Sequence, residues 1–446
     1  MNGGLSMAEM KSGYKMTDIG VIPEDWEVKT LGKLACINGR IGFRGYTVKD
    51  LVRKGEGAIA IGGKHISKNY LDLSDAEYIS WKKYYESPEI MVKQGDIVLA
   101  QRGTLGKSAL IKSDIGPATI NPSLVLINKI KCNNLYLIYN MQSSSVTDYI
   151  LQINSQTSIP MISQKQIEGI KIAIAKLDCE QAAIATALSD VDSLISALAK
   201  KIEKKKAIKQ GLMQQLLTGK KRLPGYKGLA LVKNEKMEYP GDWDVVKLGD
   251  LCRIITKQTG FDYSATIKPS LRTSRGLGVL PFIQNKDFEG YKINFNTDFY
   301  IPKDVAMHFP QILLDEPSLL VSISGRIGNV GYYLSSKLAF IGGAICVAKF
   351  WKKEYIPWVM LYLQSSKGQN EIFMNEKAGA QHNITVEAIR NFRIPMPSIS
   401  EQTAIANILS DCDSEIAALE EKRDKYKEIK QGMMQQLLTG KIRLIK

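Results

Sequence analysis

The chain has 446 residues, more than one ordinary core accommodates, and this length indicates two or three domains. Its 60 Lys and Arg against 45 Asp and Glu leave a net charge of +15, which favours a polyanionic partner, nucleic acid before a membrane surface. No apolar run approaches the roughly 20 residues that span a bilayer, and the first residues lack the apolar stretch of a signal peptide, so we expect a cytoplasmic protein without membrane contact. The six cysteines are scattered singly and there are three histidines, so we expect no metal site and no histidine-based triad.

The first globular domain is predicted to cover residues 19–177, after a flexible N-terminus over residues 1–18. This part contains short strand-like runs broken by glycine turns, such as "GDIVLAQ" at Gly95. Shorter helical stretches, such as residues 135–152, are mixed with them. The mixture indicates an α+β domain.

A long helix is predicted to follow over residues 178–219. Apolar residues recur along it at intervals of three and four, as at Leu188, Leu198 and Ile202, which is the spacing of a coiled-coil seam. Gly219 is the expected left-handed stop. Six lysines crowd one stretch of this helix: Lys200, Lys201, Lys204, Lys205, Lys206 and Lys209. They favour a solvated face, with contact to phosphate or to an acidic partner as the alternative.

The second half of the chain repeats this order. Residues 220–236 are basic and punctuated by Gly and Pro, and are predicted to be a linker. Residues 237–397 contain runs such as "SLLVSIS" and are predicted to form a second α+β domain. Residues 398–446 hold a second long helix, in which Leu409 and Ile416 keep the phase of the first seam.

The two halves are copies of one unit. A displacement of 221 places aligns Glu180 with Glu401 and continues without a gap to Leu223 and Leu444, with 30 of the 44 pairs identical. Fainter similarity extends upstream through both globular parts. The sequence therefore predicts an α+β fold with an internal pseudo-two-fold repeat, in which two globular domains are separated by two long antiparallel coiled-coil helices.

Polar and charged residues at matched places of the two halves are candidates for DNA contact. In each half one lysine follows a strand-like run, a glycine turn is flanked by cations or amides, and polar groups precede the last strand. Cations suit phosphates and guanine edges, and amides can pair with adenine. For any single residue a solvated loop group remains the alternative. The candidate DNA-binding residues are Lys64, His65, Arg102, Lys107, Gln156, Ser158, Lys286, Arg326, Asn329, Gln381, His382 and Asn383.

Three catalytic motifs fail on inspection, so we expect no catalytic residues. The segment "GTLGKSA" has the tail of a phosphate-binding loop, but Gln101 stands where that loop needs glycine, and the second half lacks its lysine. The segment "NPSL" at Asn121 lacks the second proline and the aromatic residue of an adenine methyltransferase motif. No compact carboxylate cluster suggests a nuclease.

The two helix ends, "QGLMQQLLTGK" and "QGMMQQLLTGK", look like partner interfaces because paired glutamines are flanked there by apolar side chains. The candidate docking residues are Gln214, Gln215, Leu217, Gln435, Gln436 and Leu438.

Two globular domains alternating with near-identical helices, the approach "IPMPSISEQTAIANIL" and the exit "IKQGLMQQLLTGK" resemble the specificity subunit of type I restriction-modification systems. The resemblance implies two target-recognition domains, helices that serve as spacer and as docking surface for methyltransferase subunits, and double-stranded DNA read at a bipartite, asymmetric site. It implies that S-adenosylmethionine is bound by those methyltransferase subunits and not by this chain, and that a restriction motor-nuclease subunit joins the complex. The alternatives are a coiled-coil adaptor protein without DNA recognition and a self-sufficient methyltransferase or NTPase.

Overall fold

The structure, a computed structural model, describes residues 12–67, 70–154, 161–226, 228–233, 238–376 and 383–444. The chain divides into two compact units, Met1–Ala199 with Glu421–Lys446, and Lys200–Glu420. We call them unit 1 and unit 2. Each unit combines one globular part with portions of both long helices. The predicted domain boundaries lie at the ends of the long helices. The boundaries between the two compact units lie inside both helices.

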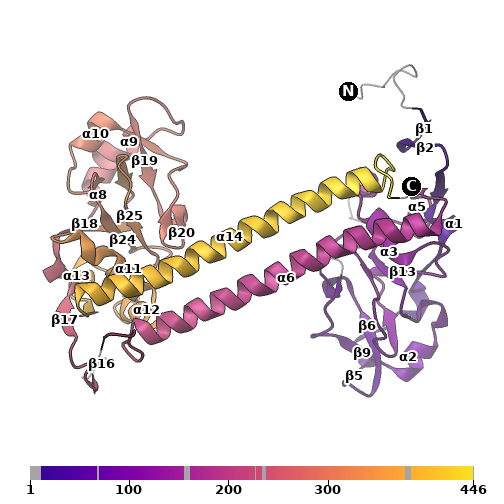
Figure 1. Cartoon of the computed structure of the whole chain (residues 1–446), viewed down its shortest axis with the longest axis horizontal. Coiled ribbons are helices and arrows are strands. Elements are labelled where there is room, and N and C mark those ends of the chain that lie inside the picture. The colour runs from indigo at the N-terminus through magenta and orange to yellow at the C-terminus, as the bar shows by residue number, and fades with distance from the viewer. Residues whose placement is uncertain are drawn as a thin grey trace. The chain divides into compact units, whose positions relative to one another are not determined.

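Both long helices are present, α6 (Asp178–Leu216) and α14 (Ile399–Leu437), each of 39 residues and close to the predicted length (Figure 1). The seam residues Leu188, Ile202 and Leu409 are buried. Beyond each helix the chain turns at a glycine with positive φ, +67° at Gly219 and +68° at Gly440. A Cβ atom at Gly440 would lie 2.4 Å from Pro23 Cγ, so both conformation and space require glycine there.

Segments of the two helices pair antiparallel within each unit. In unit 2, Lys205 Nζ lies 2.7 Å from Glu415 Oε2, and Lys209 Nζ lies 2.6 Å from Asp413 Oδ1. The later residue of α6 thus pairs with the earlier residue of α14, which is the order of an antiparallel pair. In unit 1, Lys430 Nζ lies 2.7 Å from Asp192 Oδ1. The lysine run was expected to form either a solvated face or a contact with phosphate or an acidic partner. Lys205 and Lys209 do contact an acidic partner, and that partner is the other long helix.

The globular part of unit 1 contains two four-stranded sheets. One is antiparallel with strand order β11-β10-β13-β4, and the other has the order β12-β6-β9-β5, in which β12 runs parallel to β6. Their strands are β4 (Cys36–Gly39), β5 (Leu51–Val52), β6 (Gly57–Ile61), β9 (Glu77–Ser80), β10 (Ile97–Ala100), β11 (Ser108–Leu110), β12 (Ala118–Ile120) and β13 (Leu124–Asn128). Two-stranded ladders are formed by β1 (Tyr14–Thr17) with β2 (Gly20–Pro23), β3 (Glu27–Thr30) with β14 (Lys171–Ile174), and β7 (Ile66–Ser67) with β8 (Tyr70–Leu71). The short helices are α1 (Leu31–Leu34), α2 (Trp81–Tyr85), α3 (Asn134–Met141), α4 (Ser144–Asn154) and α5 (Gln164–Glu168).

Unit 2 repeats this architecture. Its sheets have the orders β18-β27-β24-β25 and β22-β19-β26-β23, and β19 runs parallel to β26 as β6 does to β12. The strands are β18 (Cys252–Lys257), β19 (Val279–Ile283), β22 (Tyr300–Pro302), β23 (Leu313–Leu314), β24 (Ser318–Ser322), β25 (Val330–Tyr333), β26 (Ala339–Ile341) and β27 (Ile345–Phe350). The ladders are β15 (Leu231–Lys233) with β16 (Glu238–Pro240), β17 (Asp244–Lys247) with β28 (Arg393–Met396), and β20 (Phe288–Glu289) with β21 (Lys292–Ile293). The short helices are α7 (Leu248–Leu251), α10 (Lys303–Met307), α11 (Ile356–Gln364), α12 (Ser366–Met374) and α13 (Val386–Arg390).

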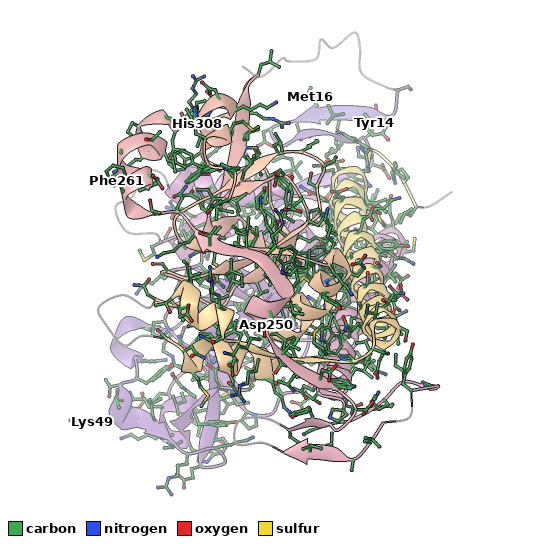
Figure 2. All side chains as sticks on the ribbon, turned by 90° about the vertical axis from the view of Figure 1, so that its left-hand side faces the viewer. Tyr14, Met16, Lys49, Asp250, Phe261 and His308 are labelled. Atoms are coloured by element: carbon green, nitrogen blue, oxygen red, sulfur yellow. The ribbon has the colours of Figure 1, made fainter. Side chains whose placement is uncertain are left out.

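The units differ in the segment between β4 and β6 of unit 1 and the corresponding segment between β18 and β19 of unit 2. Unit 1 has 3-10 turns and the edge strand β5 there, whereas unit 2 has α8 (Gly260–Asp262), a π-helical turn and α9 (Lys268–Ser270). Side chains of both segments lie at the surface, as Lys49 and the 80% exposed Phe261 illustrate (Figure 2). Two domains of common descent thus present different surfaces.

Both long helices contribute to the globular cores. In unit 1, Leu188 of α6 and Leu437 of α14 pack in one cluster with Trp26 and Tyr136. The corresponding cluster of unit 2 contains Leu216, Leu217, Trp243, Trp358 and Leu409. Since burying one leucine side chain contributes about 1.5–3 kcal/mol, the last residues of the chain stabilise the first domain.

In each unit a half-buried arginine clamps a buried glutamate and a more exposed aspartate. We call the contacts of Arg443 with Glu180 and Asp25 clamp 1; its Nη2 lies 2.8 Å from Glu180 Oε2 and 2.9 Å from Asp25 Oδ2. Clamp 2 consists of Arg222, Glu401 and Asp242 with the same geometry. Glu180 and Glu401 are both fully or almost fully buried, so each clamp satisfies a carboxylate that would otherwise lack a counter-charge.

Two segments that were predicted to be irregular contain short strands. Tyr14–Thr17, inside the predicted flexible residues 1–18, form β1, and the Tyr14 hydroxyl donates to the Gly440 carbonyl at 3.0 Å. Leu231–Lys233, inside the predicted linker 220–236, form β15. In both places a short ladder joins the chain to the entry of a globular part, which composition alone did not indicate.

The helix α6 is also long enough, and over one 18-residue stretch with mean hydropathy 1.4 apolar enough, to cross a membrane. This qualifies the expectation that no stretch approaches that length. The observation is weak evidence for a span, because Ile184 and Leu188 of the same helix pack in the core of unit 1 and Asp192 forms an ion pair.

Candidate nucleic-acid interface

A 3-10 turn follows the second sheet's central strand in each unit, as predicted for a loop that carries a lysine. The turn is Gly63–His65 after β6 and Asn285–Asp287 after β19. His65 Nδ1 accepts the Gly62 N–H at 2.9 Å, and Asp287 Oδ2 accepts the Gln284 N–H at 2.7 Å. His65 is 1% exposed, so as folded it is a structural cap and not an accessible DNA contact, which differs from the role predicted for it.

The lysine of each turn is exposed and paired. Lys64 Nζ lies 3.3 Å from Asp75 Oδ2 and 3.4 Å from Glu77 Oε1. The hydrogen bonds that Lys64 donates, first to Asp75 and then to Glu77, raise the pKa of Lys64. Lys286 pairs with Asp298 in the same way. Both lysines are therefore charged groups whose positions are fixed by neighbouring carboxylates.

The glycine turns join the same surface. Arg102 forms an isolated antiparallel bridge with Met161, and the corresponding bridge in unit 2 joins Ser324 to Asn383. Asn383 is thus placed beside the turn that carries Arg326 and Asn329. Asn285 Nδ2 donates to the Ser324 carbonyl at 2.6 Å, which ties the lysine turn of unit 2 to its glycine turn.

An open hollow in unit 1 brings four of the predicted residues together. We call it the β6 hollow; its volume is about 560 Å³, and Lys64, His65, Arg102 and Lys107 line it. The remaining lining residues are Ala60, Gly62, Gly63, Glu77, Gly103, Thr104, Asn121 and Ser123. Among the residues that the structure describes, no ion pair or hydrogen bond reaches the side chains of Arg102 and Lys107, so two uncompensated cations face this hollow.

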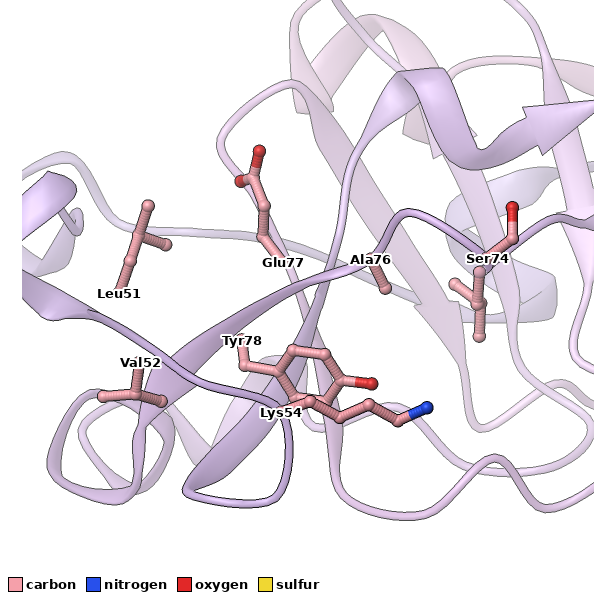
Figure 3. A pocket seen from close by; sticks show the side chains of 8 residues that line it. Leu51, Val52, Lys54, Ser74, Ala76, Glu77 and Tyr78 are labelled. Atoms are coloured by element: carbon pink, nitrogen blue, oxygen red, sulfur yellow. The ribbon is translucent and has the colours of Figure 1, made fainter.

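A second hollow of about 320 Å³ lies beside the edge strand β5 (Figure 3). Leu51, Val52 and Tyr78 supply apolar surface, and Lys54 and Glu77 supply one charge of each sign. Glu77 lines both hollows because it lies on β9, which pairs with β5 on one side and β6 on the other. The balance of charge makes the β5 hollow a weaker candidate for a polyanion.

Four predicted DNA-binding residues lie outside the described residues. They are Gln156, Ser158, Gln381 and His382.

The candidate docking residues divide into two classes. Gln214, Gln215 and Gln435 are exposed and Gln436 is half-buried. Leu217 and Leu438 are instead buried in the cores of units 2 and 1, so as folded they are not available to a partner. Periodicity could not separate the two classes, because the apolar face of each helix end meets the chain's own domain.

A hollow of about 600 Å³ adjoins the end of α14 in unit 1. Gln435, Gln436 and Leu438 line one side, and Lys171 and the start of α4 line another. A concave surface next to the exposed glutamines keeps this helix end as a candidate for partner docking.

Sequence reasoning missed several polar residues of the β6 hollow. Asn121 was considered only as part of a failed methyltransferase motif, yet it lines the hollow and its Oδ1 accepts the Ser123 hydroxyl at 2.6 Å. Thr104 and Glu77 carried no distinctive pattern. Within the described residues no group of three or more His, Cys, Asp or Glu could hold a metal ion.

Comparison with known proteins gives one consistent result. Residues 23–210 and 240–431 each match the family described as "Type I restriction modification DNA specificity domain". Two similar curated proteins from Methanocaldococcus jannaschii are the putative type I restriction enzyme MjaX specificity subunit (29% identical; 97% of each chain) and the MjaVIII specificity subunit (27% identical; 95% of this chain and 94% of the relative). A solved structure from a study of the assembly and conformational transition of a type I R-M system is 17% identical, with TM-score 0.59 over 94% of this chain and 99% of its own; it supports the fold.

Proposed function

Because the chain belongs to the family of type I restriction modification DNA specificity domains through both of its halves, we propose that it reads a bipartite, asymmetric site on double-stranded DNA, one half-site per globular domain. The matched segments cover the globular parts as well as the helices, so a coiled-coil adaptor without DNA recognition is not supported. Because the two domains differ in sequence, the half-sites should differ as well.

The observation that carries this proposal is the matched position of the polar turns. In each unit a 3-10 turn with one lysine lies near a glycine turn with one arginine: Lys64 and Arg102 in unit 1, Lys286 and Arg326 in unit 2. A net charge of +15 favours the approach of DNA to such cations. Phosphate contacts position a protein on the duplex, and neighbouring amides such as Asn329 and Asn383 are suited to base edges.

In this proposal the reaction belongs to partner subunits. Methyltransferase subunits that bind S-adenosylmethionine carry out the modification, a restriction motor-nuclease subunit cleaves, and this chain is a non-catalytic subunit of a cytoplasmic complex. The exposed glutamines Gln214, Gln215, Gln435 and Gln436 are the proposed docking contacts. Leu217 and Leu438 support them from the cores beneath.

Methylome sequencing tests the proposal. A host that expresses this chain with its methyltransferase subunits should acquire methylation at one motif made of two unlike half-sites. The double variant R102A/K107A should weaken methylation by weakening the DNA contacts of unit 1. The variant R326A should do the same through the contacts of unit 2. A palindromic motif, or modification that is independent of this chain, would contradict the proposal.

A further inference from the structure

The two units differ at the start of the lysine turn, and one of these differences opens the β6 hollow. In unit 1 the turn begins with Gly62 and Gly63, whereas the corresponding residues of unit 2 are Gln284 and Asn285. The Asn285 side chain reaches across to the Ser324 carbonyl at 2.6 Å. The space that Asn285 occupies in unit 2 is therefore left open by Gly63 in unit 1.

Hydroxyl groups surround the open position. A Cβ atom placed on Gly63 would lie 3.7 Å from Ser123 Oγ and 3.9 Å from Thr104 Oγ1. A Cβ atom on Gly62 would lie 2.7 Å from Asn121 Nδ2, so an amide nitrogen also borders the space. The Thr104 hydroxyl and the Asn121 amide can donate hydrogen bonds to an acceptor with several oxygens, whereas the Ser123 hydroxyl already donates to Asn121 Oδ1.

The charge around the hollow is positive. Glu77 is the carboxylate that lines it, and Lys64 pairs with both Glu77 and Asp75, which offsets one of these two negative charges. Arg102 and Lys107 then remain as cations without a partner among the described residues. An anion entering the hollow would meet two uncompensated positive charges in addition to the neutral donors.

A buried histidine supports one wall. His65 Nδ1 accepts the Gly62 N–H, so in the neutral ring the hydrogen lies on Nε2. Nε2 is buried and has no hydrogen-bond acceptor in the described part of the chain, since Asp75 Oδ1 is 3.5 Å away. The buried His65 ring thus holds the turn at Gly62 and Gly63 in place.

We propose that the β6 hollow seats one phosphate group of the DNA backbone, and that unit 2 has no such seat because Asn285 fills it. The inference rests on the proposed function and makes it more specific: unit 1 holds the duplex through one more phosphate contact than unit 2 at this place. Because backbone contacts carry no base information, this seat contributes affinity and register and leaves the sequence of the half-site unchanged.

The substitution Gly63→Asn tests the seat with little disturbance of the fold. Gly63 lies in a 3-10 turn without positive φ, and its Cβ would make only ordinary contacts. The new amide would reproduce what Asn285 does in unit 2. The matched control is Asn285→Gly, which opens the corresponding space without supplying the cations of unit 1.

The measurement is DNA affinity of the full complex with its methyltransferase subunits, from about 50 to 200 mM salt. Losing one phosphate contact lowers the slope of log affinity against log salt by about 0.9, which is about a 3- to 4-fold change across this range. At the low-salt end G63N should bind about 10-fold more weakly than the wild type. A duplex with a neutral methylphosphonate at the contacted position should bind wild type and G63N equally.

Three results would overturn the seat. They are unchanged affinity of G63N, weaker affinity with an unchanged salt slope, and a methylated motif that changes in G63N, since the last two indicate contact with a base. A titration with inorganic phosphate distinguishes DNA phosphate from free phosphate as the ligand. If inorganic phosphate binds the wild type but not G63N, and both proteins bind DNA equally well, the hollow binds free phosphate. In each case wild-type methylation of a bipartite motif would leave the proposed function intact, whereas its absence would refute that function instead.

Discussion

The two clamps are built from the same residue types but differ in one hydrogen bond from a tryptophan. Trp26 Nε1 donates to Glu180 Oε2 at 3.2 Å in clamp 1. The corresponding Trp243 Nε1 is buried and finds no acceptor within the described residues. Glu180 therefore accepts a hydrogen bond from a tryptophan in addition to those from its arginine. Glu401 does not accept a hydrogen bond from Trp243.

This difference predicts unequal costs for the two arginines. R222A and R443A should each destabilise the unit concerned by about 3–5 kcal/mol, because each leaves a buried carboxylate without its counter-charge. R443A should cost about 1 kcal/mol less, because the Trp26 hydrogen bond remains. Hydrogen exchange read separately in each unit measures both values. As a control, adding W26F to R443A should remove the difference; equal costs without W26F would argue against a role for the indole.

The clamps also predict acid sensitivity. The hydrogen bond from Arg443 lowers the pKa of Asp25, and that from Arg222 lowers the pKa of Asp242. A folded-state pKa below the unfolded value, about 3.9, means that the stabilisation is complete above that pH and is lost as the pH falls through the folded pKa. The melting temperature of the wild type should therefore fall more steeply below about pH 4 than that of D25N/D242N. Parallel curves for the two proteins would mean that the clamps do not respond to acid.

At the scale of elements, the long helices were predictable and their charged contacts were not. Seam spacing and the glycine stops identified helices of about the observed length, because both signals are local. The partners of Lys205 and Lys209 depend on which residues of α14 pass beside them, and a solvated face was the favoured expectation. The same limit applied to Leu217, His65 and Asn121, whose roles follow from tertiary neighbours and not from local pattern.

The antiparallel pairing predicts that charge order matters along the helices. K209D places two carboxylates together at a contact where Lys209 and Asp413 are 17% and 23% exposed, and it should cost at least about 1 kcal/mol. The exchange K209D/D413K restores opposite charges and should recover most of that loss. Thermal unfolding of the two single variants and the double variant gives the coupling energy. Additive losses would show that the two side chains do not interact.

At the scale of the whole molecule, each compact unit is built from both repeats. The chain passes from unit 1 to unit 2 within α6 and returns within α14. Sequence comparison found the repeat but placed the domain boundaries at the helix ends, because similarity between copies does not reveal which segments pack together. Leu437, Leu438 and Arg443 belong to unit 1 although they lie in the second copy.

This interleaving sets the conditions for testing whether helix length determines the gap between half-sites. Four residues inserted after Ala199 alone would displace α6 against an unchanged α14. The pairs Lys209–Asp413 and Asp192–Lys430 could then not both keep their partners. We expect this variant to unfold at lower temperature than the wild type. A matched insertion of four residues after Glu420 extends both helices at the unit boundary and should restore both pairs and the stability.

The doubly extended protein should modify a longer site. Four residues add about 6 Å of helix at 1.5 Å per residue, close to one turn. Since DNA rises about 3.4 Å per base pair, the spacer between half-sites should grow by at most about two base pairs, with both half-sites unchanged. Methylome sequencing reads the spacer directly. Exchange of residues 237–397 for those of another family member should change one half-site and leave the spacer alone. An altered half-site after the double insertion, or two altered half-sites after the exchange, would mean that helices and domains share recognition.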